Sequence, residues 1–526
     1  MNIFRRKAGE PHKGRREARF AGTWYESDRN RLENQMDGFL VSARNQLVER
    51  PCDPLFSDNP EPINKGLLAL IVPHAGYMFS GSTAAYAYEF AGENTKPERV
   101  FLLGPSHYVG FEGIALSQCK SFETPLGDLK VDRDCVNELG RFPFFQTADE
   151  VHQREHSLEL QLSFIKHVFG DVKLIPLVVG MFKEEEDIKL AGQILKRHLG
   201  DSDLVVVSSD FTHYGPRYDY VPFERDFPNR VKSLDEDAFG FIRDGDLDGF
   251  LDFHDRTGCT ICGFYPCSLL LSMLPDDTRA SLLKYGTSRD SYKEDSKNSV
   301  SYLALVLTSA RGGWESKESQ DTFELTVKEK KDALALARLV VEHKARGEKV
   351  PGSDDLNSDI GGNLAKELGV FVTLFKRKPG KLLGKSAEPR SDKELRGCIG
   401  YIWPVKPLYQ AIVDNAVGAA SRDPRFPPVK ANELKDLQIE ISVLTPLKPV
   451  SSIEEIEIGR HGVVFYCQDS QSVFLPHVAT EFGWDREETL NQLALKAGLK
   501  KDAWKSSEAR FDVFESIMFE EFEDIE

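Results

Sequence analysis

The chain has 526 residues, of which 40% are hydrophobic and 29% are charged, and its formal net charge is −17. This length exceeds what one hydrophobic core usually organises, so we expect two or three domains. The acidic balance argues against nucleic acid as a partner of the whole surface. The absence of a run of about 18 apolar residues argues against a membrane-spanning helix.

The start of the chain and the cysteines indicate where the protein resides. Residues 1–15 are basic and carry no apolar stretch, so they differ from a secretory signal, and we expect a disordered leader. Eight cysteines are too few, and too irregularly spaced, for a disulfide scaffold. We therefore expect reduced thiols and a cytoplasmic location.

Helix-like and strand-like segments alternate from residue 16 to residue 310. Apolar residues recur at helical spacing in residues 30–47, 157–169 and 186–199. Continuous apolar, β-branched runs typical of buried strands occupy residues 67–72, 99–103, 172–180, 203–209 and 300–309. This alternation predicts an α/β domain over residues 16–310, with a mainly parallel or mixed sheet flanked by helices.

The pattern changes after residue 310. Residues 311–322 are polar and without periodicity, which is typical of a linker between domains. Beyond them, helical patterns at 330–345 and 408–423 are separated from strand-like runs at 369–377, 396–402 and 437–446. Separate helices and alternating strands predict an α+β domain over residues 323–526.

Three strand-like runs of the first domain end in a small polar turn that carries a histidine. These turns hold His74, His107, and the pair Asp210 and His213. Ligands and catalytic groups of open α/β sheets gather at the carboxyl ends of the strands. The three imidazoles and the carboxylate therefore predict a metal or acid–base site at one edge of the sheet, although a single histidine after a strand is more often structural.

Two further segments offer polar groups to such a site. Cys259 and Cys262 have the spacing of half a zinc knuckle or of a redox pair, but no second such motif is present. A single thiolate from Cys262 beside two imidazoles suits iron, copper or zinc. His156 and Glu159 lie three residues apart in a helical pattern, where they form either an exposed polar stripe or a set of groups that orient a ligand.

In the second domain, Cys398 is the residue most suggestive of chemistry. It lies between Arg396 and Gly400, and Asp423 and Arg425 could supply charged partners. A nearby cation can lower the pKa of a thiol and make it a nucleophile. The alternative is a buried cysteine that acts as a small apolar residue.

The first domain resembles the Memo family. The matching stretches run in order from about residue 16 to residue 310: REARFAGTWY, VPHAGYMFSG, LGPSHYVG, EHSLELQL, SSDFTHYG, ICGFYP, YGTSRD and NSVSYLAL. Memo proteins are similar in fold to the class III extradiol ring-cleaving dioxygenases, which are non-haem iron enzymes. The resemblance thus implies an extradiol-dioxygenase-like α/β core.

The resemblance also implies roles for the residues of the sheet edge. It places His74, His107 and Cys262 as metal ligands, His213 as the catalytic base, and Asp210 in the same pocket. The ring-cleaving enzymes use a carboxylate as the third ligand, whereas a thiolate would stand here. Because a thiolate donates more charge and can be oxidised, cleavage of a catechol does not follow from the fold.

The second domain resembles the AMMECR-type domain over about residues 325–520. The matching stretches are LGVFVTLFK, ELRGCIGYI, NAVGAASRDPRFPPV, ELKDLQIEISVLTP, HGVVF and VFLPHVATEFGWDREETLNQLALKAGL. In prokaryotes the two modules are associated with a radical-SAM protein in the AmmeMemoRadiSam set. The resemblance therefore implies that both domains serve one process and that a radical-SAM protein is a partner.

Three functions are compatible with these observations. The first is a non-haem iron oxidoreductase, dioxygenase-like, that acts on an unidentified small or nucleotide-like substrate and in which His213 moves a proton. The second is a catalytically degenerate metal-binding scaffold or signalling protein. The third is zinc hydrolysis, since the resemblance alone selects iron over copper or zinc.

Overall fold

The structure, a computed structural model, describes residues 14–521 except for 50–65, 143, 224, 293–294, 296, 311, 315–323, 351–361, 378–392, 404–405, 451, 468–469 and 507–508. The chain forms two compact units, Met1–Lys317 and Glu318–Glu526, which divide within the stretch predicted as a linker. Residues 1–13 of the predicted leader lie outside the described residues, and strand β1 begins at Arg15. None of the helices described here is both long and apolar enough to cross a membrane.

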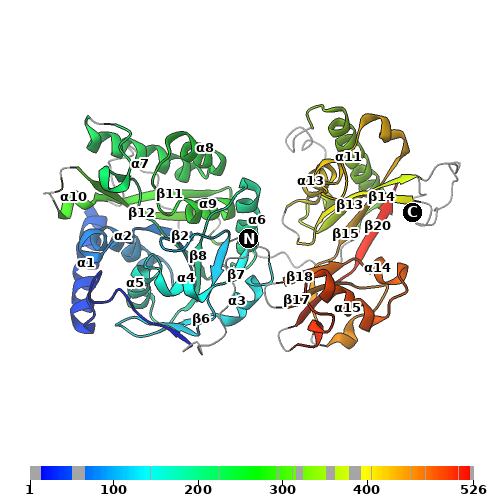
Figure 1. The fold of residues 1–526 in the computed structure, drawn as a ribbon. Coiled ribbons are helices and arrows are strands. Elements are labelled where there is room, and N and C mark those ends of the chain that lie inside the picture. Colours follow the sequence, from blue (N-terminus) through cyan, green and yellow to red (C-terminus); the bar gives the residue numbers. More distant parts are fainter. Residues whose placement is uncertain are drawn as a thin grey trace. The chain divides into compact units, whose positions relative to one another are not determined.

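The first unit is built on a mixed β-sheet (Figure 1). Its described strands follow the order β1-β5-β6-β8-β3-β9-β2-β12-β10, with β11 paired to β12, and with β4 paired to β8 and β7. From β6 to β2 the neighbouring strands are parallel, and β12 is antiparallel to β2. The strands are β1 (Arg15–Arg16), β2 (Gly66–Val72), β3 (Arg99–Pro105), β4 (Ile114–Leu116), β5 (Ser121–Phe122), β6 (Leu129–Val131), β7 (Phe145–Thr147), β8 (Lys173–Val179), β9 (Asp203–Ser208), β10 (His213–Tyr214), β11 (Thr278–Thr287) and β12 (Ser299–Ser309).

Both faces of the central strands are covered. Nearly every side chain of β2, β3, β8 and β9 is buried, as expected for continuous apolar runs in a parallel sheet. Helix α2 packs against β2 and β12, and α9 packs against β3 and β9. The helices are α1 (Arg29–Glu49), α2 (Tyr77–Asn94), α3 (Arg133–Leu139), α4 (Asp149–Arg154), α5 (Glu159–Phe169), α6 (Glu185–Lys196), α7 (Phe227–Asp244), α8 (Leu247–Thr257), α9 (Phe264–Met273) and α10 (Ser288–Ser291).

Strands β3, β9 and β2 are adjacent and parallel. Their carboxyl ends therefore meet at one edge of the sheet, and the chain leaves each strand there in a short turn. This is the arrangement that the sequence predicts. It brings the three histidine-bearing turns into one region.

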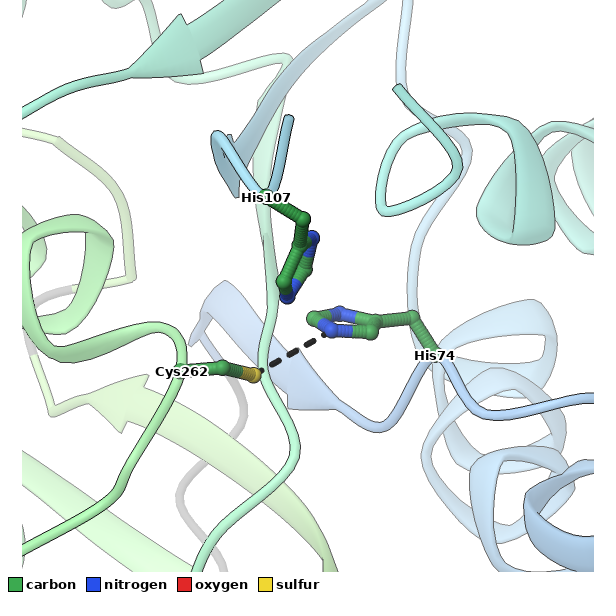
Figure 2. Close-up of side chains that lie close together, drawn as sticks. All are labelled: His74, His107 and Cys262. Atoms are coloured by element: carbon green, nitrogen blue, oxygen red, sulfur yellow. Dashed lines mark hydrogen bonds between the residues drawn. The ribbon is translucent and has the colours of Figure 1, made fainter. Parts of the chain in front are cut away.

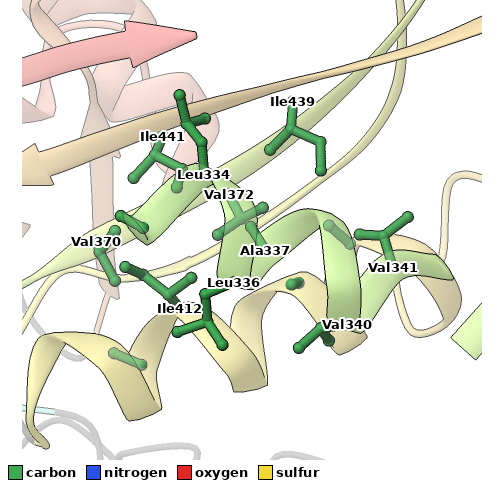
Figure 3. Close-up of a cluster of buried hydrophobic side chains, with 14 of the residues drawn as sticks. Leu334, Leu336, Ala337, Val340, Val341, Val370, Val372, Ile412, Ile439 and Ile441 are labelled. Carbon is green, nitrogen blue, oxygen red and sulfur yellow. The ribbon is translucent and has the colours of Figure 1, made fainter. Parts of the chain in front are cut away.

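The second unit contains an antiparallel sheet in the order β14-β13-β15-β20. Helices α11 and α13 pack on it through a cluster of aliphatic side chains that includes Val340, Val370, Ile412 and Ile441 (Figure 3). Helix α11 begins after Thr326, whose hydroxyl accepts a hydrogen bond from the Glu329 N–H. The elements are α11 (Val327–Arg346), α13 (Leu408–Ser421), β13 (Val370–Arg377), β14 (Lys393–Tyr401), β15 (Leu437–Leu444) and β20 (Ser516–Glu520).

A second antiparallel sheet, β16-β19-β17-β18, lies in the same unit and has its own core around Phe465 and Leu490. Its elements are β16 (Lys448–Pro449), β17 (Gly462–Cys467), β18 (Ser470–Phe474), β19 (Arg510–Phe514), α14 (Pro476–Glu481) and α15 (Arg486–Lys496). Antiparallel sheets with separate helices confirm the predicted α+β class. The mixed sheet of the first unit confirms its predicted α/β class.

Candidate metal centre

Three side chains from distant parts of the sequence converge beyond the carboxyl ends of β2 and β3 (Figure 2). His74 follows β2, His107 follows β3, and Cys262 precedes α9. One ligand atom from each of the three lies within 4.8 Å of the other two. The His74 Nε2 atom is 3.2 Å from the Cys262 Sγ atom. The two imidazole rings meet edge to face, with centroids 5.1 Å apart.

Ser208 fixes the protonation of His74. The Ser208 hydroxyl donates its only proton to the Ser157 carbonyl, at 2.6 Å, and accepts a hydrogen bond from the Gln161 amide. The His74 Nδ1 atom lies 3.0 Å from the same hydroxyl oxygen, so Nδ1 must be the donor of that contact. The lone pair of His74 therefore resides on Nε2, the atom that faces Cys262.

Glu155 has the same effect on His107. Its carboxylate accepts hydrogen bonds from the His107 backbone N–H at 2.7 Å and from His107 Nδ1 at 2.9 Å. Burial opposes ionisation of Glu155, but the hydrogen bond and charge of His107 outweigh it and lower the pKa to about 2. A carboxylate behind an imidazole fixes its tautomer and raises its basicity as a ligand. The Nε2 atom of His107 is thus left free to bind a metal.

The environment of His74 and Cys262 favours the neutral form of both side chains. Burial, with the nearby imidazoles, lowers the pKa of His74 well below its usual value. Burial, with the charge of Asp210, raises the pKa of the Cys262 thiol well above its usual value. A neutral imidazole is already the form that binds a metal, and a bound cation would favour the thiolate over the thiol.

His213 and Asp210 lie at the same edge but outside this group of three. The Nδ1 atom of His213 lies 2.9 Å from the Phe211 carbonyl oxygen and 3.0 Å from the Thr260 carbonyl oxygen, so it carries the proton. Its Nε2 atom is therefore the basic one. Asp210 accepts a hydrogen bond from the His74 backbone N–H at 2.8 Å, and burial raises its pKa. Asp210 thus holds the turn that carries His74.

His156 belongs to the same region. Its ring stacks on His107 at 4.4 Å and lies 4.4 Å from the ring of Trp24. Together with His107 and Glu155 it forms a second group of potential ligand atoms within 4.8 Å of one another. Burial lowers its pKa to about 4.

The sequence reasoning located His156 incorrectly and did not single out Glu155. His156 lies in the connection between α4 and α5, so it does not share a helical face with Glu159, and both side chains are buried. The exposed polar stripe considered for this pair is therefore wrong. Glu155 could have been found only through its position beside His156, because its partner His107 is 48 residues away in the sequence.

Cys398 lies in the second unit, on β14, so it is not part of this group. Its sulfur accepts a hydrogen bond from the Thr373 hydroxyl at 3.3 Å, and its backbone N–H donates to Asp423 at 2.9 Å. Arg425 pairs with Asp423, which confirms a charged pair beside the cysteine. Burial nevertheless raises the pKa of the Cys398 thiol. A nucleophilic role stays a prediction, and the raised pKa disfavours a thiolate at neutral pH.

Comparison with known proteins divides the chain in the same way. The family described as Memo-like protein matches residues 16–306, and the family AMMECR1 matches residues 334–519. The memo-1 homologue of Caenorhabditis elegans is 32% identical over 306 residues, which cover 56% of this chain and 82% of that protein. The MEMO1 proteins of Xenopus tropicalis and Homo sapiens are each 31% identical, over 56% of this chain and 97% of theirs.

Two solved structures are also similar to parts of the chain. An uncharacterised protein of Pyrococcus horikoshii is 33% identical, with 38% of this chain and 94% of that chain covered and a TM-score of 0.33. An uncharacterised protein of Escherichia coli K12 is 11% identical, with 46% and 99% covered and a TM-score of 0.34.

Proposed function

The chain belongs to the Memo family through residues 16–306 and carries an AMMECR1 domain at residues 334–519, and we propose that its first unit binds iron at His74, His107 and Cys262 and oxidises a small molecule there. One observation carries the proposal. The three donor atoms lie within 4.8 Å of one another, and the hydrogen bonds that Nδ1 of each imidazole donates leave both rings with a free Nε2 lone pair.

The donor set fits a first-row transition metal. Two neutral imidazoles and one thiolate suit iron, copper or zinc, and three protein ligands leave positions open for water or substrate. The buried carboxylate of Glu155 supports His107, as carboxylates often support metal-bound histidines. When bound, iron would supply Lewis acidity and one-electron chemistry at the open positions.

The residues around the donors suggest how a substrate is handled. The His213 imidazole holds its proton on Nδ1, so its Nε2 can accept a proton from a bound substrate and later return it. The hydroxyl of Thr260 accepts from the His213 backbone N–H and donates to its carbonyl, which holds the turn in place. The ring of Trp24, which packs against His156, offers apolar surface in the same region.

The rest of the proposal rests on the association of these two domain types with a radical-SAM protein in prokaryotes. We propose that the AMMECR1 domain acts in the same process as the metal centre, and that a radical-SAM protein is a partner of this chain. We also place the protein in the cytoplasm, because eight cysteines are too few and too irregularly spaced for a disulfide scaffold.

Metal analysis of the full chain, purified without oxygen, tests the ligand assignment. We expect stoichiometric iron in the wild type and its loss in His107→Ala and in Cys262→Ser. His167→Gln is a matched control, because His167 lies on α5 and contacts Asp37 rather than the donors. Unchanged metal content in His107→Ala and Cys262→Ser would refute the assignment.

Oxygen uptake then separates the functions that the site allows. Uptake by the iron-loaded chain that falls in His213→Ala, with iron retained, supports an oxidoreductase. Retained iron with no uptake under any substrate tried supports the metal-binding scaffold. Stoichiometric zinc in place of iron would overturn the redox proposal and favour hydrolysis.

A further inference from the structure

The first unit contains a cavity lined by residues other than His74, His107 and Cys262. Its volume is about 440 Å³, within the range of small-molecule sites. Side chains from α7, β11, α10 and β12 line it, and the polar ones are Lys232, Tyr285, Thr287, Arg289, Asp290 and Ser299. The stretch YGTSRD, which supplies four of these residues, plays no part in the metal centre.

Arg289 is the lining residue whose hydrogen-bonding capacity is not satisfied by the described residues. Its guanidinium lies over the ring of Phe227, with Cζ 4.9 Å from the ring centroid. Its Nε atom is buried without a hydrogen-bond partner, and within the described residues the side chain makes no ion pair. A guanidinium has five N–H donors and is always charged, so a partly buried one without an acceptor is unfavourable. An anion in the cavity would satisfy it.

Ser299 and Lys232 are further hydrogen-bond donors in the lining of the cavity. Ser299 lines the cavity and is 4% exposed, so its hydroxyl is a potential donor at the cavity wall. Lys232 adds a second cation to the lining. Asp290 is the one acid among the lining residues, and its carboxylate is already bound to the Thr287 N–H at 2.7 Å. The lining therefore combines two cationic side chains with one carboxylate that already accepts a backbone hydrogen bond.

We propose that this cavity binds a small phosphate monoester, with its phosphoryl oxygens on the guanidinium of Arg289 and on Lys232 and Ser299. A planar guanidinium matches two oxygens of a phosphate at once, and the stacked ring of Phe227 limits its rotation. The volume beyond the phosphate leaves room for the rest of a small metabolite. The proposal does not depend on a metal at His74, His107 and Cys262.

The cavity is connected to the metal centre through the chain segment that carries His213. In the pairing of β10 with β12, Ser299 lies opposite Tyr214, whose ring stacks on Phe227 at 4.5 Å. The Tyr285 hydroxyl donates to Asp235, which also accepts from Thr212. A ligand in the cavity would thus contact Ser299 and Tyr285. Ser299 lies opposite Tyr214, which follows His213, and Tyr285 is linked through Asp235 to Thr212, which precedes His213.

Titration calorimetry on the metal-free full chain tests this site. The probes are inorganic phosphate, glycerol 3-phosphate and ribose 5-phosphate, with glycerate and citrate as carboxylate counterparts. We expect saturable binding of at least one phosphate monoester, weakened by about ten-fold or more in Arg289→Gln. Arg289→Lys should recover part of the affinity, because it keeps the charge and loses the planar fork.

Arg230→Gln is the matched control. Arg230 lies on α7 over the ring of Phe223, also at 4.9 Å, but it does not line the cavity. This variant should bind as the wild type does. The proposal is overturned if no phosphate monoester shows saturable binding, if Arg289→Gln binds unchanged while its circular dichroism matches the wild type, or if Arg230→Gln weakens binding equally. Equal affinity for the carboxylates would refute the phosphate assignment.

Discussion

At the scale of single residues, the proposed metal centre depends on two groups that are not among its proposed ligands. Ser208 and Glu155 each hold the proton of one imidazole on Nδ1, and so turn the Nε2 lone pair toward the other donors. The strand-end pattern of the sequence located His74, His107, Asp210 and His213. It could not locate the two supporting residues, because their contacts join segments that are distant in the sequence.

Replacement of Ser208 by alanine tests this orientation. The substitution removes the acceptor of the His74 Nδ1–H, so the proton can move to Nε2 and compete with the metal. We expect the metal affinity to fall by about ten-fold, the lower end of the range for such supporting residues. Competition with a chelator at fixed pH measures it.

Ser117→Ala is the control for the loss of a buried hydroxyl. Ser117 is fully buried in the same unit and donates to Asp149 rather than to a group at the metal centre. Its substitution should leave the metal affinity unchanged. Equal losses in the two variants would show that general destabilisation, not orientation of His74, lowers the affinity.

At the scale of elements, the buried carboxylate of Glu159 links the first described segment of the chain, which includes residues 16–25, to the start of helix α5. Glu159, the first residue of α5, accepts hydrogen bonds from the Phe20 N–H at 2.7 Å and the Tyr25 hydroxyl at 2.9 Å, and it pairs with Arg16. Both charged side chains are almost completely buried. This attachment places Trp24 against His156.

Glu159→Gln should therefore release this segment. Removal of one partner of a buried ion pair leaves the other charge uncompensated, and it typically costs about 3–5 kcal/mol. We expect much faster hydrogen–deuterium exchange in residues 14–25, measured by mass spectrometry. Asp171→Asn is the comparison, because Asp171 pairs with Lys166 near the other end of α5 but is 92% exposed, and exposed ion pairs contribute little to stability. Similar exchange in the two variants would contradict the anchoring role.

The elements also show what sequence patterns reveal and what they miss. Strands β2, β3, β8, β9 and β12 were predicted, since a strand buried on both faces must be a continuous apolar run. Helix α2 was not, because it is buried around most of its circumference and so lacks a polar stripe. Strands of two or three residues, such as β10, are too short to show an alternation of apolar and polar residues. They are recognised only by their hydrogen bonds to a neighbouring strand. Cys262 was a candidate through its spacing from Cys259, but only the family resemblance joined it to His74 and His107, because it precedes a helix and does not end a strand.

At the scale of the whole molecule, the two units have separate cores. In the second unit the aliphatic cluster around Val370 and Ile412 and the smaller one around Phe465 draw on residues beyond 318. In the first unit the core lies around β2, β3 and β9, and the three proposed metal ligands lie at the edge of that sheet. Metal binding at these residues would therefore be linked to the folding of one unit.

Calorimetry of the full chain, with and without metal, tests this linkage. A ligand that binds only the native state stabilises it by RT ln(1 + [L]/Kd), or about 2.7 kcal/mol at one hundred times Kd. Iron should raise the midpoint of one unfolding transition by several degrees. Addition of a chelator should reverse the shift, and His107→Ala should abolish it. Mass spectrometry of protease fragments released between the two transitions identifies which unit unfolds first. If iron shifts the transition assigned to residues 318–526, or shifts both equally, then the metal is not confined to His74, His107 and Cys262.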